Sequence, residues 1–186
     1  MKNQIIVITG PKHSGKTLCA RALAKLTGWA AADLDEQVTK ETGRTPRELF
    51  KESPEVFRKA EAAALASLSR PGEMKSSLII AAGGGLIDNS EAVELLSQHR
   101  EINTVYLEVS SGTAWRRILS SAAAEGELPP FLKTENPGET HAALHERRAG
   151  SYKALAQFTV SAENKSPEEI AGEIVNHFQL PVDSVG

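Results

Sequence analysis

One segment of the chain has the residue types and spacing of a phosphate-binding loop, G-x-x-x-x-G-K-[ST]. It follows an apolar run at 5–8 and precedes a helical pattern of apolar residues, which is the strand–loop–helix context that such a loop requires. Backbone N–H groups of the loop, with the positive end of the helix dipole behind them, bind phosphate oxygens. We therefore predict a nucleotide-phosphate site made by Gly10, Pro11, Lys12, His13, Ser14, Gly15, Lys16 and Thr17.

Two residues of this loop have specific predicted roles. Lys16 is expected to reach the β- and γ-phosphates, and the Thr17 hydroxyl is expected to bind Mg²⁺. Asp33 is the candidate for further metal support, because the apolar strand at 78–82 ends in glycines rather than in an acid. The guanine-reading motif N-K-x-D of GTPases is absent. A loop near residue 130 that is flanked by proline and glycine is typical of a small phosphoryl-transfer kinase with a closing lid.

Other charged residues and glycines allow both a functional and a structural interpretation. Asp33 and Asp35 follow a short apolar strand, where open α/β sheets bind ligands, but they also suit the N-terminal region of a helix. The triplet Gly83-Gly84-Gly85 either allows close approach to a ligand or forms a tight strand exit. Arg58 could belong to a solvent-exposed ion pair, and Arg148 to the charged face of a polar helix.

The elements that must position these residues alternate between strand and helix. Five apolar segments are predicted to be strands, at 5–8, 29–32, 78–82, 104–109 and 158–161. Helices are expected between them, with N-terminal signals at Thr45-Pro46, Ser53-Pro54, Ser90 and Ser166-Pro167. This alternation indicates an α/β fold in which a parallel sheet is covered by helices on both faces.

Composition limits the partners and the compartment. The chain has 186 residues, a formal net charge of -3 and one cysteine. This charge provides no basic footprint for nucleic acid, and no apolar run approaches the roughly 20 residues that a membrane span needs. The N-terminus leads directly into the first strand, so we expect no signal peptide. We predict a cytoplasmic monomer with one domain, residues 1–180, and a flexible tail, residues 181–186.

The candidate motifs occur in the order and spacing of one known family. They are Asp33-x-Asp35, Phe57-Arg58-Lys59-Ala60-Glu61, Gly83-Gly84-Gly85 and Arg148-x-x-x-Tyr152. In these positions the chain resembles shikimate kinases, from Ile5 to about Phe178. The resemblance implies a P-loop NTPase fold of the nucleoside-monophosphate-kinase type, with a five-stranded parallel sheet of order 2-3-1-4-5. It also implies ATP-dependent phosphorylation of the shikimate 3-hydroxyl in aromatic amino acid (chorismate) biosynthesis, with ATP and Mg²⁺ as cofactors.

The resemblance further implies roles for individual residues. Asp35 matches a position that hydrogen-bonds substrate hydroxyls and helps take the proton, and Asp33 matches one that supports Mg²⁺ through water. Arg58 and Arg148 would hold the substrate carboxylate, which suits planar, bidentate guanidinium groups. Glu61 would orient Arg58. The remaining matches are pocket-lining glycines and adenine-contacting arginines, namely Gly83, Gly84 and Gly85, and Arg116 and Arg117.

The predicted lid, at about 112–138, departs from the family pattern. Shikimate kinases usually carry Arg-Pro-Leu-Leu there, with an arginine that contacts ATP phosphate and substrate, whereas this chain has Pro129-Pro130-Phe131-Leu132. A cation on the transferring phosphoryl group can be worth roughly 10³ to 10⁵ in rate. A substitute could come from Lys133, Lys12, Arg116 or Arg117; without one, turnover would be low.

Two other functions remain open. One is a related P-loop kinase for another small hydroxy-acid or sugar acid, such as a gluconate or antibiotic phosphotransferase, which would not need Arg58, the glycine triplet and Arg148 together. The other is an ATP-binding protein that is similar to shikimate kinase but catalytically impaired. Retention of the P-loop lysine and of both acids argues against the second alternative.

Overall fold

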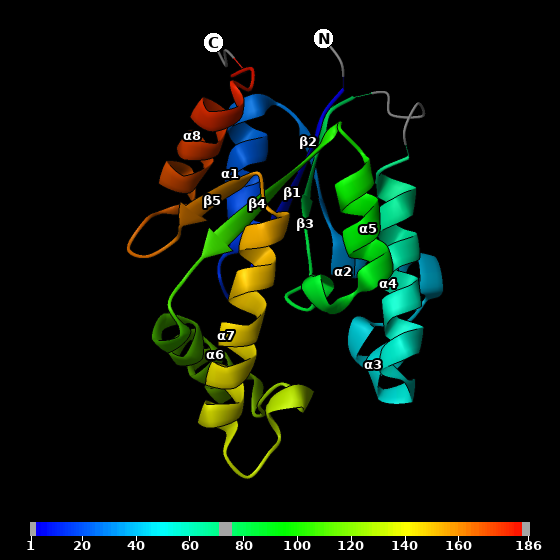
Figure 1. The fold of residues 1–186 in the computed structure, drawn as a ribbon, viewed down its shortest axis with the longest axis vertical. Helices are drawn as coiled ribbons and strands as arrows, with labels where there is room; N and C mark the ends of the chain where they lie inside the picture. Colours follow the sequence, from blue (N-terminus) through cyan, green and yellow to red (C-terminus); the bar gives the residue numbers. More distant parts are fainter. Residues whose placement is uncertain (1–2, 71–75, 184–186) are drawn as a thin grey trace.

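A parallel sheet of five strands forms the centre of the computed structural model, which describes residues 3–70 and 76–183 (Figure 1). The strands are β1 (Ile5–Thr9), β2 (Ala30–Asp33), β3 (Leu78–Ala81), β4 (Ile102–Glu108) and β5 (Phe158–Ser161). Their order is β2-β3-β1-β4-β5, and every pairing is parallel. The predicted α/β class and the strand order 2-3-1-4-5 are confirmed.

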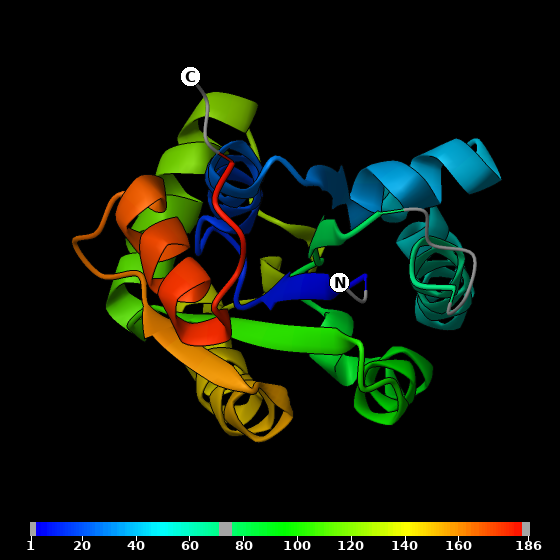
Figure 2. The same cartoon turned by 90° about the horizontal axis from the view of Figure 1, so that it is seen from above.

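Helices join successive strands and cover both faces of the sheet, as Figure 2 shows from above. The described residues contain α1 (Lys16–Thr27), α2 (Leu34–Thr42), α3 (Pro46–Glu52), α4 (Pro54–Leu68), α5 (Ser90–Gln98), α6 (Ser111–Glu125), α7 (Pro137–Leu155) and α8 (Pro167–Phe178). Two 3₁₀ helices, η1 (Leu86–Asp88) and η2 (Pro130–Leu132), were not predicted, because a single turn carries no periodic apolar pattern.

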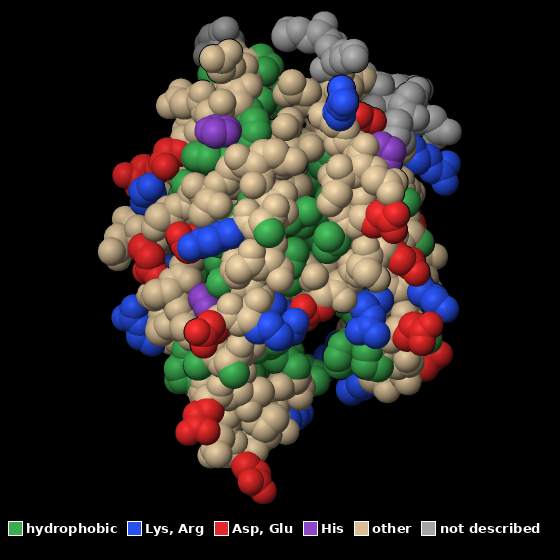
Figure 3. All heavy atoms as spheres, viewed as in Figure 1, with side chains coloured by type: hydrophobic (Ala, Val, Ile, Leu, Met, Phe, Trp, Pro, Cys, Tyr) green, Lys and Arg blue, Asp and Glu red, His purple; other side chains and the backbone are tan. Residues whose placement is uncertain are grey.

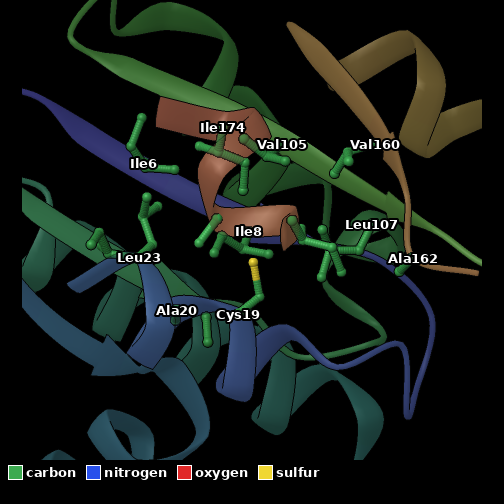
Figure 4. Packing of buried hydrophobic residues seen from close by; sticks show 14 of the residues in the cluster. Ile6, Ile8, Cys19, Ala20, Leu23, Val105, Leu107, Val160, Ala162 and Ile174 are labelled. Atoms are coloured by element: carbon green, nitrogen blue, oxygen red, sulfur yellow. The ribbon is translucent and has the colours of Figure 1, made fainter. Parts of the chain in front are cut away.

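Alternating side chains of the central strand β1 divide the core into two halves. Ile6 and Ile8 pack with residues of α1 and α8 on one face (Figure 4). Ile5 and Val7 pack with residues of α2, α4 and α5 on the other face. All four side chains are fully buried. A continuous apolar run is therefore required here, since a strand covered on both faces has no side that can be polar.

Several element boundaries differ from the prediction. Strand β4 begins at Ile102, two positions before the predicted start at 104. Helix α5 is capped by Asn89 and not by Ser90, because the Asn89 carboxamide accepts the hydrogen bond from the Ala92 N–H (3.4 Å). The capping box predicted at Ser166 is present. The predicted tail is described only to Asp183, whose N–H donates to the Leu26 carbonyl (2.8 Å), and residues 184–186 lie outside the described part.

The segments that follow β1, β2 and β3 meet at the carboxyl edge of the sheet. The phosphate loop follows β1, Asp33 is the last residue of β2, and the glycine triplet follows β3. On either side of this edge stand α3 and α4, and α6 with the start of α7 (Figure 1). In open parallel sheets this edge binds the ligand, so the fold brings the predicted site residues to the expected place. No helix in residues 3–70 or 76–183 has the length and apolar character to span a membrane.

Candidate active site

The loop between β1 and α1 has the backbone of a phosphate cradle. Gly10 and Gly15 have positive φ angles of 144° and 101°, and a Cβ on Gly10 would lie 2.7 Å from the Leu107 carbonyl oxygen. The Lys16 ammonium group is buried and donates to the carbonyl oxygens of Gly10 (3.1 Å) and Pro11 (2.7 Å). Burial lowers the pKa of Lys16 to about 8, although the charge of Asp35 opposes this shift. Lys16 is thus a desolvated cation at the helix N-terminus.

Thr17 and Asp33, the residues predicted to support a metal, contact one another. The Thr17 hydroxyl donates to one Asp33 carboxylate oxygen (2.9 Å), and the other oxygen accepts the Asp35 N–H (3.0 Å) at the start of α2. Asp33 is therefore the N-cap of α2, and its role in metal binding stays a prediction. The hydroxyl and carboxylate oxygens suit Mg²⁺, which takes few protein ligands and completes its shell with phosphate and water. Among the described residues, no three acidic, histidine or cysteine side chains cluster as a metal cage.

Two carboxyl groups converge on Gly83. A Cβ placed on Gly83 would lie 3.1 Å from an oxygen of Asp35 and 3.1 Å from an oxygen of Glu61. Asp35 is open to solvent, but desolvation by surrounding atoms, followed by the charge of Asp33, raises its pKa. A Cβ at this position would require the two carboxyl groups to move by a few tenths of an ångström, so glycine allows both acids to approach the loop after β3 closely.

Glu61 is the more deeply buried of these acids, with 1% of its surface exposed. Burial raises its pKa to about 7, against a hydrogen bond from Asn89. The Asn89 amide donates to Glu61 (2.9 Å) and to the Arg58 carbonyl oxygen (2.8 Å). Among the described residues, the second Glu61 carboxylate oxygen has no hydrogen-bond partner. The contact between Asn89 and Glu61 was not predicted, because nothing in the sequence indicates that these two residues meet.

The predicted carboxylate-binding Arg148 is held by a network that the sequence did not reveal. Asp88, at the end of η1, accepts hydrogen bonds from Nε (2.9 Å) and Nη2 (2.6 Å) of Arg148, while Nη1 donates to the Gly84 carbonyl (3.1 Å). The Tyr152 hydroxyl donates to the same carbonyl (2.6 Å). Asp88 also forms two hydrogen bonds with Arg147. Burial favours a higher pKa for Asp88, but these hydrogen bonds outweigh it and lower the pKa.

The glycine triplet and the phosphate loop touch. A Cβ on Gly84 would lie 2.9 Å from the backbone nitrogen of Lys12 and 3.2 Å from its Cα. Such a distance is shorter than real Cβ contacts allow, and both partners are backbone. Gly84 is therefore needed for the loop after β3 to pack against the loop after β1.

Arg116 and Arg117 lie on α6, which packs against α7, the helix that carries Arg148. The Arg117 guanidinium donates to the His13 carbonyl oxygen (3.1 Å), and Arg116 donates to the Thr113 hydroxyl (3.0 Å). Both arginines line a groove of about 430 Å³ that also contains Glu163, Asn164 and Lys165, from the loop after β5. The hydrogen bond from Arg117 to His13 connects this groove to the phosphate loop.

The predicted lid contacts α3 across the site. Glu127 forms ion pairs with Arg47 of α3 and with Lys133 (2.6 Å). Figure 3 shows a hollow between the side of α3 and α4 and the side of α6 and α7, with Lys and Arg side chains on both rims. The predicted residues of the P-loop, β2, the glycine triplet and α7 are thus joined by direct contacts. Arg58 is exposed on α4, and its carbonyl oxygen accepts the hydrogen bond from the Asn89 amide.

Comparisons with known proteins agree on one family. A family model described as shikimate kinase matches residues 12–179. The shikimate kinase of Corynebacterium efficiens is 31% identical over 181 residues, which are 96% of this chain and 99% of the relative. That of Thermobifida fusca is 35% identical over 170 residues, 90% of each chain. The structure of shikimate kinase from Acinetobacter baumannii in complex with shikimate matches with a TM-score of 0.82 and 27% identity, covering 96% of this chain and 94% of that one.

Proposed function

The chain belongs to the shikimate kinase family, and from this membership and the geometry of its site we propose that it phosphorylates shikimate. The reaction transfers the γ-phosphoryl group of ATP to the 3-hydroxyl and gives shikimate 3-phosphate and ADP, a step of chorismate biosynthesis. The enzyme is an ATP-dependent phosphotransferase with an alcohol acceptor.

The observation that carries this proposal is the position of the glycine triplet between two kinds of group. Gly83 faces the oxygens of Asp35 and Glu61, and Gly84 accepts hydrogen bonds from Arg148 and Tyr152. A small ring with hydroxyl groups at one end and a carboxylate at the other would match the acids near Gly83 and the arginine near Gly84. Arg148 then binds the carboxylate with Arg58, and Asp35 accepts hydrogen bonds from the hydroxyl groups.

The nucleotide occupies the phosphate loop in this proposal. Lys16 binds the β- and γ-phosphates, and Arg116 and Arg117 border the base. Thr17 and Asp33 would hold Mg²⁺, directly or through water, and the ion would neutralise phosphate charge. The raised pKa of Asp35 makes this carboxylate a better acceptor for the hydroxyl proton. We further propose that the enzyme acts in the cytoplasm as a monomer and does not bind nucleic acid.

An assay of ADP release with several acceptors tests the proposal. Shikimate, gluconate and a nucleoside monophosphate are supplied separately with MgATP, and the Lys16→Ala variant is the control for contaminating kinases. We expect turnover with shikimate only, and none with the variant. Preference for gluconate would support a sugar-acid kinase instead. Binding of ATP without turnover of any acceptor would support an impaired, ATP-binding protein.

A further inference from the structure

The lid of this chain cannot supply a cation to the transferring phosphoryl group from its central segment. Residues 126–132 contain no lysine or arginine. Phosphoryl transfer nevertheless requires positive charge around the equatorial oxygens of the γ-phosphoryl group, because the chemistry depends on positioning and electrostatic stabilisation. Lys16 is one such cation. Mg²⁺, when bound, would supply further positive charge, and a second cationic side chain has to come from another element.

Most cations near the site already have partners. Lys133 is paired with Glu127 (2.6 Å), and Arg147 and Arg148 are paired with Asp88. On α6, Arg117 donates to the His13 carbonyl and Arg116 to the Thr113 hydroxyl. These groups would have to break existing contacts in order to turn toward the phosphates.

Lys12 differs from these cations because it would not have to break a contact with another described residue. Its ammonium group forms no hydrogen bond or ion pair with the described residues, and its side chain is exposed. The backbone of Lys12 packs against Gly84, in the loop that faces the acceptor. Lys12 is one of the residues that line a cavity with Phe131 of the lid, Arg148 and Tyr152.

The charge of Lys12 also acts on the two groups between which the phosphoryl group moves. It lowers the pKa of Lys16 and opposes the rise in the pKa of Asp35. The contacts place Lys12 close to both groups, because the preceding residue, Pro11, accepts a hydrogen bond from Lys16 (2.7 Å), and Gly84, which packs on the Lys12 backbone, follows the glycine that faces Asp35. The ammonium group of Lys12 stands on a flexible four-carbon stem, so it can turn about its own side-chain bonds without breaking a contact with the described residues.

The geometry points to Lys12 as a catalytic residue that contacts the transferring phosphoryl group from the phosphate loop. This inference rests on the proposed function. In the step, the substrate oxygen forms a bond to the γ-phosphorus and the bond from that phosphorus to the β,γ-bridging oxygen breaks. The electron pair of the broken bond passes to ADP, and the hydroxyl proton passes to Asp35. Lys12 stabilises the charge on the oxygens that remain on phosphorus.

Steady-state kinetics of Lys12→Met test this inference. Removal of the ammonium group is expected to lower kcat by about 10² to 10³, the usual cost of one such donor, with smaller changes in the KM values for MgATP and shikimate. Lys12→Arg should restore a substantial part of kcat, since it keeps the charge. Because the side chain is exposed, the melting temperatures should equal that of the wild type, which excludes a structural effect.

Control variants distinguish Lys12 from other lysines as the source of positive charge at the phosphoryl group. Lys25→Met removes the same group from the last turn of α1, away from the site, and should leave kcat unchanged. An unchanged kcat in Lys12→Met, or a loss confined to Lys133→Met, would overturn the role of Lys12 while wild-type turnover of shikimate upheld the proposed function. Absence of wild-type turnover would overturn both.

Discussion

The Lys16 ammonium group lies in a buried environment, where desolvation destabilises its charged form. This burial lowers its pKa to about 8. Below this pH the lysine is protonated and can bind phosphate; as pH rises through 8 it becomes neutral. The charged phosphates of bound ATP favour the protonated form and raise the pKa again.

The pH dependence of ATP use follows from this pKa. We expect kcat/KM for MgATP to fall above about pH 8, by up to tenfold per pH unit, because this parameter reports ionisation in the free enzyme. The kcat should fall only at higher pH, since it reports the complex. Initial rates between pH 6 and pH 10, with coupling enzymes in excess, measure both. A kcat/KM that stays constant to pH 10 would contradict the assignment.

Asp88 shows how a side chain outside the predicted set can control one inside it. Two atoms of the Arg148 guanidinium bond to one Asp88 oxygen, which holds the guanidinium plane against Gly84. Hydrogen bonds to charged groups are worth about 1.5–3 kcal/mol. Without them, Arg148 would have to be ordered when the substrate carboxylate binds.

The Asp88→Asn variant should therefore bind shikimate more weakly. We expect its KM for shikimate to rise about tenfold, the equivalent of about 1.4 kcal/mol, with a smaller change in kcat and none in KM for MgATP. Glu91→Gln, which neutralises an exposed acid on the first turn of α5, is the matched control. An equal loss with both variants would indicate a general charge effect instead.

The lid and α3 are two separate elements that an exposed ion-pair cluster connects. Glu127 accepts from Arg47 and from Lys133, and its partners' side chains are about half exposed. Exposed ion pairs contribute about 0.2–1 kcal/mol each and are screened by salt. The cluster should therefore bias the lid toward α3 only modestly.

Glu127→Gln is expected to raise the KM for shikimate about two- to fivefold, because the lid then closes over the substrate less readily. The same effect should shrink at high salt. A double-mutant cycle with Arg47→Ala measures the coupling through KM. Independent, additive effects of the two substitutions would show that the pair does not act on the closed state.

Glu61 links the site to the stability of the whole molecule. Its carboxyl is almost completely buried, and its pKa is raised to about 7 from 4.5. A raised pKa means that the folded protein binds the proton more tightly than the unfolded chain does. The contribution that the bound proton of Glu61 makes to the free energy of unfolding is therefore fully present below about pH 4.5 and is lost as pH rises through 7.

The Glu61→Gln variant should consequently be more stable than the wild type in alkaline solution. We expect an advantage of about 2–3 kcal/mol in the free energy of unfolding at pH 8, and little difference at pH 5. Urea denaturation of both proteins at pH 5, 6.5 and 8 measures it. Glu36→Gln, which changes an exposed acid on α2, serves as control. A difference that does not depend on pH would refute the explanation.

Much of the fold could be predicted because its signals are local. The apolar run at Ile5–Thr9, the phosphate-loop spacing and the capping box at Ser166 each depend on neighbours within a few positions. Boundaries failed where a local signal was ambiguous, as at Asn89 and Ser90, since either side chain can cap a helix. The strand order came from the family resemblance, because periodicity alone does not say which strands pair.

The residue types that make this chain a kinase, and the loop that binds phosphate, are written in local patterns of the sequence. The partners of those residues are not. Asp88 meets Arg148 across sixty positions, Asn89 meets Glu61 across 28, and Lys12 meets Gly84 between two loops. Such contacts arise only when β1 and β3 pair and α7 folds back over the sheet edge, because long-range neighbours are set by packing of whole elements. Tertiary structure therefore decided which arginine Asp88 holds and which acid is buried.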